Sequence, residues 1–179
     1  MTLIQCTQKL LKELPIDQEI IMANFPSLLG NWHANLIRIE RRKCVLFTND
    51  ETLYSFFIPG VKKQNFQNLA STFMCHFILN FKHEGLDQYK DVVMQERDRL
   101  EFTKSSSRSV LGTMNNMSYI ISSYISRHGG MDEINYLKLN YHINNMPFNF
   151  PLKDNKYDFP IHVMKRKLGC PIKNLDLKE

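Results

Sequence analysis

The run Lys104-Ser105-Ser106-Ser107-Arg108-Ser109 combines hydroxyl groups with two cations ahead of a long amphipathic stretch. Serine favours the N-cap position, so we expect a helix to begin within this run. The first N–H groups of a helix lack partners and lie at the positive end of the helix dipole, which makes the position suitable for a phosphate. We therefore name Lys104, Ser106, Ser107 and Arg108 as candidate ligand-binding residues. The alternative is ordinary helix capping with Arg108 in solvent.

A second group of candidate residues follows Gly30 and consists of Trp32, His33, Asn35 and Arg38. An imidazole acts as a general acid or base or holds a phosphate, so His33 is the candidate catalytic residue. An exposed tryptophan stacks on nucleic-acid bases, which gives Trp32 a binding role. Alternate side chains of a strand share a face, so we expect His33 and Asn35 to point one way and Arg38 the other. The alternative is a packed, hydrogen-bonded histidine with a structural role.

Asn115 and Gly112 are poor residues for the interior of the helix expected after Ser107. Asparagine there suggests a local hydrogen-bonding role, so Asn115 is also a candidate ligand-binding residue. Glycine costs about 1 kcal/mol against alanine, so we expect a strand or a ligand to approach the Gly112 backbone closely. Close packing within the protein is the alternative. We predict that this helix start and the His33–Arg38 strand lie within reach of one ligand and form an anion-binding cleft.

The hydrophobic pattern predicts one α+β domain over residues 1–148, followed by an extended, proline-containing segment over 149–179. Alternating apolar and β-branched residues indicate an antiparallel sheet of about four strands, packed against two to four helices. The main expected strands cover 33–39, 43–48, 52–58 and 99–103, with a short strand at 2–6. Helices are expected near 66–82 and 107–128, with weaker helical patterns near 86–96 and 132–144.

The chain has 179 residues, of which 43% are apolar, and a formal net charge of +5. It can bury a full core, and its charge favours anionic partners where it is clustered. No apolar run reaches the roughly 18 residues that cross a bilayer, and the N-terminus has no signal-peptide pattern, so we expect a cytoplasmic protein without a membrane partner. The four separated cysteines offer no metal-ligand spacing, and the familiar glycine-rich nucleotide motifs are absent. We therefore expect no metal site and no cofactor.

Four sequence blocks stand out: CTQKLLK at 6–12, LGNWHANL at 29–36, RRKCVLFTN at 41–49 and FTKSSSRSVLGTMN at 102–115. Together they resemble a bacterial family of small, stand-alone proteins of unknown function. The resemblance covers residues 1–145 and leaves the chain beyond residue 150 unmatched. It implies no activity, substrate or catalytic residue.

Three classes of function agree with these patterns. The first, which we favour, is a module that binds a phosphate-bearing ligand, with nucleic acid as its most natural form because of the basic residues 41–43. The second is a small metal-independent enzyme that acts on a phosphodiester or nucleotide, with His33 as acid or base and Lys104 or Arg108 stabilising developing charge. The third is a protein–protein interaction component of a bacterial two-protein module. The candidate partners are therefore a nucleic acid or nucleotide, or another protein.

Overall fold

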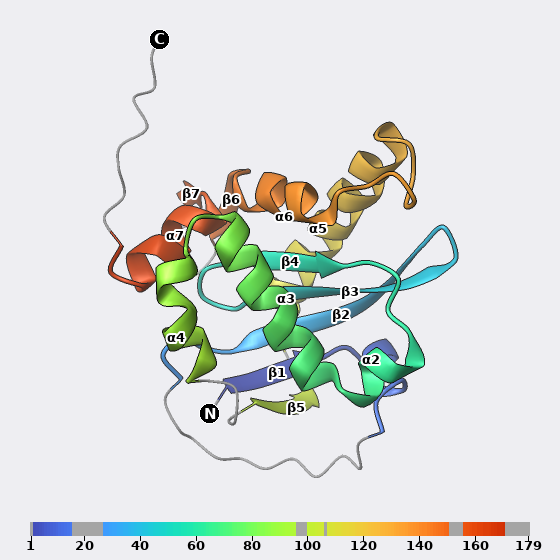
Figure 1. Cartoon of the computed structure of the whole chain (residues 1–179), viewed down its shortest axis with the longest axis horizontal. Helices are drawn as coiled ribbons and strands as arrows, with labels where there is room; N and C mark the ends of the chain where they lie inside the picture. The colour runs from blue at the N-terminus through green and yellow to red at the C-terminus, as the bar shows by residue number, and fades with distance from the viewer. Residues whose placement is uncertain (1, 16–26, 96–99, 106, 151–155, 171–179) are drawn as a thin grey trace.

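A five-stranded β-sheet forms the centre of the molecule, and helices cover both of its faces (Figure 1). The structure is a computed structural model that describes residues 2–15, 27–95, 100–105, 107–150 and 156–170. These residues form seven α-helices and, besides the main sheet, a two-stranded sheet. The predicted α+β class and the single domain are confirmed. Among the described helices, none combines the length and the apolar character needed to cross a membrane.

The middle of the sheet is the antiparallel meander that the sequence predicts. β2 (Trp32–Ile39), β3 (Arg42–Asn49) and β4 (Ser55–Ile58) pair in that order. Glu40 and Arg41 form the two-residue turn between β2 and β3, with positive φ angles of 47° and 66°. A turn of this kind matches the twist of the strands that it joins, so it sets the register of β2 on β3.

Two strands at the other side of the sheet correct the predicted topology. β1 (Thr2–Cys6) lies between β2 and β5 (Leu100–Lys104) and is parallel to both, which gives the order β4-β3-β2-β1-β5. The sheet is therefore mixed and has five strands, whereas we expected an antiparallel sheet of about four. Parallel neighbours are joined by long connections rather than by hairpins. Pairing between segments so far apart leaves no local signal in the sequence.

One face of the sheet packs on α3 (Leu69–His83) through a cluster of aromatic rings. Alternation along β2 points Trp32 to this face, where it belongs to the main buried cluster. The centroid of its ring lies 4.8 Å from that of Phe77 and 5.2 Å from that of Phe73, in edge-on arrangements that aromatic pairs favour. The helix predicted near 66–82 is thus confirmed. Shorter helices flank α3 in the sequence: α2 (Lys63–Gln67) precedes it, and η1 (Asp87–Tyr89) and α4 (Lys90–Met94) follow it.

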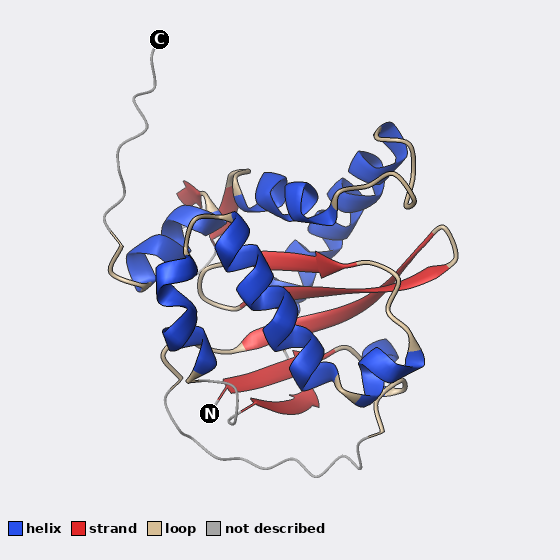
Figure 2. Ribbon diagram, viewed as in Figure 1, coloured by secondary structure: helices blue, strands red, loops and turns tan. Residues whose placement is uncertain are grey.

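The other face packs on α5 (Arg108–Arg127), and α6 (Tyr136–Asn144) lies alongside α5 (Figure 2). The buried stripe of α5 includes Met114 and Ile121, which belong to the same buried cluster as Leu46 of β3. The predicted long helix is confirmed nearly residue for residue. On one side of this stripe α5 contacts α6, and on the other side it lies over β2.

Gly112 lies on the exposed side of α5. A Cβ atom at this position would meet no atom within 4 Å beyond its chain neighbours and the backbone of its own helix. The expectation that a strand approaches this backbone closely is therefore wrong, and so is the alternative of close packing within the described part of the protein. Gly112 lowers the stability of the helix without a packing reason.

Side chains of α6 take the place of a neighbouring strand at the outer edge of β4. The Asn140 carbonyl oxygen accepts the Phe57 N–H at 2.8 Å, and the Asn140 amide donates to the Phe57 carbonyl oxygen at 3.2 Å. Asn144, one turn later, makes the same two bonds to Ser55, at 2.8 and 2.9 Å. Residues four apart on a helix share a face, as do residues two apart on a strand. The two asparagines therefore pair the outward backbone groups of an edge that would otherwise be open to other chains.

The C-terminal part of the chain corrects a second expectation. We expected residues 149–179 to be extended, but the described part of this range contains regular structure. β6 (Phe148–Phe150) pairs with β7 (Lys156–Asp158), and α7 (Pro160–Lys167) follows. Pro160 stands at the first turn of α7, where a missing N–H costs nothing, and Met164 is buried in the main core. This proline begins a helix instead of excluding one.

Candidate anion-binding cleft

A cleft opens where β1 ends and β2 continues without it. β1 stops at Cys6 beside Ala34, while β2 runs on to Ile39. The start of α1 (Gln8–Leu11) and the first half of α5 provide the remaining lining. The volume of the cleft is 690 Å³, within the usual range of small-ligand sites. It is lined by Thr7, Gln8, Lys9, Asn35, Leu36, Ile37, Arg38, Leu111, Asn115 and Ser118.

Two cations line this cleft, and no carboxylate is found among its described lining residues. Lys9 and Arg38 form no ion pair with any part of the chain that the structure describes. The neighbouring Lys43, in contrast, is paired with Glu13 at 2.6 Å. A cation without an acidic partner is not neutralised locally, so its charge attracts an anionic ligand. These two cations therefore make the described lining of the cleft positively charged.

Amide groups also line the cleft, and the expected alternation holds, with Asn35 on the face of β2 toward α5 and Arg38 on the face toward α3. The Thr7 hydroxyl donates to the side-chain oxygen (Oδ1) of Asn35 at 3.1 Å. This bond leaves the side-chain N–H groups of Asn35 available as donors. Within the described ranges, no hydrogen bond uses the side-chain N–H groups of Asn35 or Asn115. The cleft thus brings together three of the predicted site residues from distant parts of the chain, Asn35, Arg38 and Asn115.

The start of α5 contributes less than we expected. Ser107 is the N-cap, and its hydroxyl oxygen accepts the Val110 N–H at 3.5 Å, so it acts as an ordinary cap. Lys104 and Arg108 are exposed and are not among the residues that line the cleft. Ser106 lies outside the described residues. The hollow beside α5 is found further along the helix, from position 111 to position 118.

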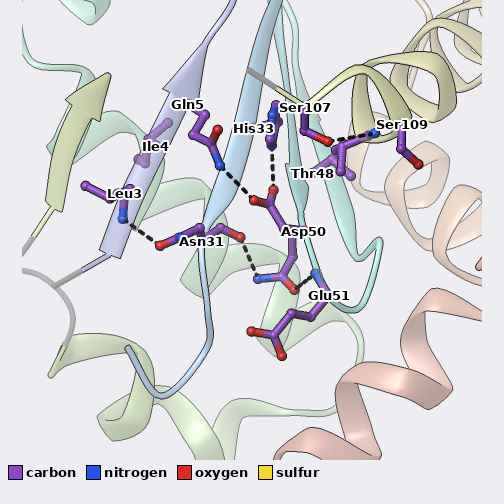
Figure 3. A network of polar contacts seen from close by, with 12 residues as sticks. Leu3, Ile4, Gln5, Asn31, His33, Thr48, Asp50, Glu51, Ser107 and Ser109 are labelled. Atoms are coloured by element: carbon purple, nitrogen blue, oxygen red, sulfur yellow. Dashed lines mark hydrogen bonds and ion pairs between the residues drawn. The ribbon is translucent and has the colours of Figure 1, made fainter. Parts of the chain in front are cut away.

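His33 belongs to a buried polar network with Asp50 and Gln5 (Figure 3). It lies two residues before Asn35 in β2 but is not among the residues that line the cleft. Its side chain is fully buried, and its Nδ1 donates to one oxygen of the Asp50 carboxylate at 2.6 Å. The Gln5 amide donates to the other oxygen of Asp50 at 2.9 Å. The His33 Nε2 is buried and lacks a hydrogen-bond partner within the described structure. A carboxylate on Nδ1 leaves Nε2 as the atom that exchanges a proton, which is the local arrangement of a general base.

Trp32 and Tyr54 lie in the core and not at a binding surface. Trp32 is 1% exposed and points to the face of β2 opposite to His33, and Tyr54 is completely buried. The expectation that Trp32 stacks on a base is therefore wrong, and Tyr54 is equally inaccessible. The physical reason is the strand alternation itself, which sends Trp32 into the cluster formed with α3.

Comparison with known families gives the chain a relationship but no activity. Residues 3–163 match the family described as "Domain of unknown function (DUF6933)". The chain belongs to this family. The match confirms the resemblance to a family of unknown function and extends it past residue 150, through β6 and β7 into α7. No curated protein and no solved structure matches the chain.

Sequence reasoning identified His33 in this family member but missed both of its partners. Asp50 follows Asn49 at the end of β3, and such an Asn-Asp pair on its own indicates only a turn. The register of β2 on β3 places Thr48 opposite His33, with Asp50 just beyond, so a two-residue turn at Glu40-Arg41 would have indicated the contact. Gln5 lies opposite His33 through the parallel pairing of β1 with β2, for which the sequence holds no comparable signal.

A smaller hollow of 480 Å³ lies on the other flank of α5, between α5 and α6. Its lining includes Tyr124 and His128, whose stacked rings have centroids 3.9 Å apart, together with the cation Arg127. None of the predicted site residues lines it. It serves below as the comparison for experiments on the cleft.

The cysteines are not part of the cleft lining. Cys6 and Cys44 are buried, and burial raises the pKa of the Cys6 thiol to about 12, whereas Cys75 is exposed. Across the part of the chain that the structure describes, no three histidine, cysteine or acidic side chains are grouped as metal ligands.

Proposed function

We propose that this protein is a binding module for a phosphate-bearing ligand, with nucleic acid or a nucleotide as the natural form of that ligand. One observation carries the proposal. The cleft is lined by two cations, Lys9 and Arg38, that form no ion pair with a described residue, and by the amides of Asn35 and Asn115, and none of its described lining residues is acidic. A bacterial cytoplasm, where such ligands are abundant, is the setting that we propose.

Phosphate chemistry suits this donor set. The guanidinium group of Arg38 offers a planar pair of donors to two phosphate oxygens, and Lys9 adds a compact charge. The neutral amides of Asn35 and Asn115 add direction without further charge. Lys104 and Arg108, exposed at the start of α5, extend the basic surface for a ligand longer than one nucleotide. Binding that depends on such contacts weakens as salt rises.

Fluorescence anisotropy of a labelled single-stranded oligonucleotide, measured over a series of salt concentrations, tests the proposal. Arg38→Ala should weaken binding about tenfold at low salt, because it removes a charge-assisted contact. It should also reduce the slope of log affinity against log salt by about 0.7 for each lost phosphate contact.

Arg127→Ala is the matched control, because it removes the same charge from the second hollow. Unchanged binding in Arg38→Ala, or a loss confined to Arg127→Ala, contradicts the proposed site. A chain that binds no phosphate-bearing ligand and co-purifies with another protein would favour the third expected function instead.

The His33–Asp50 pair favours a second candidate function, a metal-independent enzyme that acts on a phosphodiester or nucleotide. This candidate requires a substrate to reach His33 Nε2, which is buried, and His33 is not among the residues that line the cleft. In such a reaction Nε2 would accept the proton of the attacking hydroxyl group, and Asp50 would stabilise the imidazolium that results. The test is turnover of a phosphodiester in the presence of a chelator. His33→Gln and Asp50→Asn should each abolish turnover while leaving oligonucleotide binding intact. Absence of turnover in the wild-type protein contradicts this candidate.

A further inference from the structure

Backbone groups of β2 face the cleft without a partner among the described residues. The Ala34 carbonyl oxygen accepts the Thr7 N–H at 2.9 Å, so Ala34 turns its backbone groups toward β1. Alternate residues of a strand turn their backbone groups to the same side. Leu36 and Arg38 therefore turn theirs to the side where β1 has ended, while Ile37 pairs with β3. No other described residue forms a backbone hydrogen bond with Leu36 or Arg38 on that side.

This open edge differs from the opposite edge of the same sheet. At β4, Asn140 and Asn144 pair the outward backbone groups of two residues. At β2, the outward groups of Leu36 and Arg38 lie beside the cleft without a described backbone partner. Unpaired backbone groups at a strand edge are available for pairing with another molecule. This edge is therefore a surface to which a ligand can add hydrogen bonds.

We propose that this edge of β2 reads the base of a mononucleotide or of an unpaired nucleotide in a single strand. The inference rests on the proposed function, because the phosphate of the same ligand would bind the side chains of Lys9 and Arg38. Leu36 and Arg38 present N–H and carbonyl groups in alternation. The hydrogen-bonding edge of an unpaired base likewise carries donors and acceptors side by side. A phosphate carries acceptors alone and leaves the carbonyl groups of Leu36 and Arg38 without donors.

Two other ligands fit this edge less well. A peptide strand also pairs with an open strand edge, but here just two residues face outward before the turn at Glu40, so a peptide would gain few main-chain hydrogen bonds. The two cations, which pair with no described acidic residue, also favour a ligand with its own negative charge. In a nucleic-acid duplex the base edges that match this pattern are already paired, so the edge selects single strands and nucleotides.

Isothermal titration calorimetry tests the inference. The probes are inorganic phosphate, ribose 5-phosphate, the four 5′-mononucleotides, and one oligonucleotide in single-stranded and in duplex form. At least one mononucleotide should bind about tenfold more tightly than ribose 5-phosphate, because it adds two or more hydrogen bonds. The single strand should bind more tightly than the duplex. Equal affinity for all mononucleotides and for ribose 5-phosphate would show that the base makes no contact. That result overturns the inference and is compatible with the proposed function. Absence of binding by every phosphate probe overturns both, as does tight binding of an extended acidic peptide alone.

Two substitutions at one position separate the backbone from the side chain. Arg38→Ala should weaken the binding of the preferred mononucleotide and of ribose 5-phosphate by the same factor. Arg38→Pro removes the outward N–H as well, at an edge position whose N–H makes no bond to β3, where proline is tolerated. The ratio of the two affinities should then fall toward one. The same ratio in both variants overturns the inference.

Amide hydrogen exchange in the wild-type protein decides the question if Arg38→Pro does not fold. The Leu36 and Arg38 amides should exchange quickly without ligand, and the Ile37 amide, which pairs with β3, should exchange slowly. The preferred mononucleotide should slow the exchange of the Leu36 and Arg38 amides, and ribose 5-phosphate should not. Exchange that is unchanged by the mononucleotide overturns the inference.

Discussion

Asn140 is the side chain on which the outer edge of β4 depends, and Asn140→Ala is expected to destabilise the fold. The substitution leaves three buried groups without their partner: the N–H and the carbonyl oxygen of Phe57, and the carbonyl oxygen of Asn80, which accepts the Asn140 amide at 2.9 Å. A buried polar group without a partner costs about 1 to 3 kcal/mol. The low end of this range, applied to three groups, gives about 3 kcal/mol in the free energy of unfolding.

Urea unfolding followed by circular dichroism measures this free energy, and hydrogen exchange locates the change. In Asn140→Ala the Phe57 amide should lose its protection, whereas the Ser55 amide, which bonds to Asn144, should keep it. Asn116→Ala is the matched control, because Asn116 is exposed on α5, and it should change stability by no more than about 0.5 kcal/mol. Equal stabilities of the two variants, or a Phe57 amide that stays protected, would refute the edge-capping role.

Three further predictions concern titration, helix stability and thiol reactivity. Burial raises the pKa of Glu84 from 4.5 to about 7, so the folded protein binds this proton more tightly than the unfolded chain does. The resulting contribution to the free energy of unfolding is complete below about pH 4.5 and is lost as the pH rises through about 7. Urea unfolding at about pH 8 should therefore show Glu84→Gln more stable than the wild type by up to about 3 kcal/mol, with the difference shrinking toward acid pH; parallel pH curves would contradict this. Gly112→Ala should raise the free energy of unfolding by about 0.5 to 1 kcal/mol, and a loss of stability would show that its surroundings are not open. Under native conditions an alkylating reagent should modify Cys75 and spare Cys6, as mapped by mass spectrometry, and equal modification of both would disprove the burial of Cys6.

Elements with strong local patterns were predictable from the sequence. The β2–β3 hairpin shows its alternation on either side of Glu40-Arg41, and α5 has a serine cap at Ser107 and two glycines after its end. Gly129 and Gly130 indeed have positive φ angles of 88° and 89°, which glycine adopts at little cost. Asn35, Arg38 and Asn115 were named as site residues because each combines an unusual setting with hydrogen-bonding groups, and all three line the cleft.

The remaining features depend on contacts between distant segments. The parallel pairing of β1 places Gln5 opposite His33, yet nothing near Gln5 in the sequence specifies a neighbour. Asn140 has the same local pattern as a surface asparagine, and its role follows only from where α6 meets β4. Pro160 misled the interpretation of the C-terminal segment, because proline breaks a helix interior but suits a first turn. Trp32 was assigned to the surface because composition does not show which face of a strand is covered.

The central claim is that the cleft beside α5 binds a phosphate-bearing ligand. An NMR titration of isotope-labelled protein with a 5′-mononucleotide tests it most directly, because it reports every amide at once. We expect the largest shifts in the side-chain amides of Asn35 and Asn115 and in the backbone of Arg38, with no shift in the lining of the second hollow around Arg127. Shifts confined to the second hollow, or none at any ligand concentration up to about 1 mM, the weak limit of specific binding, would contradict the account.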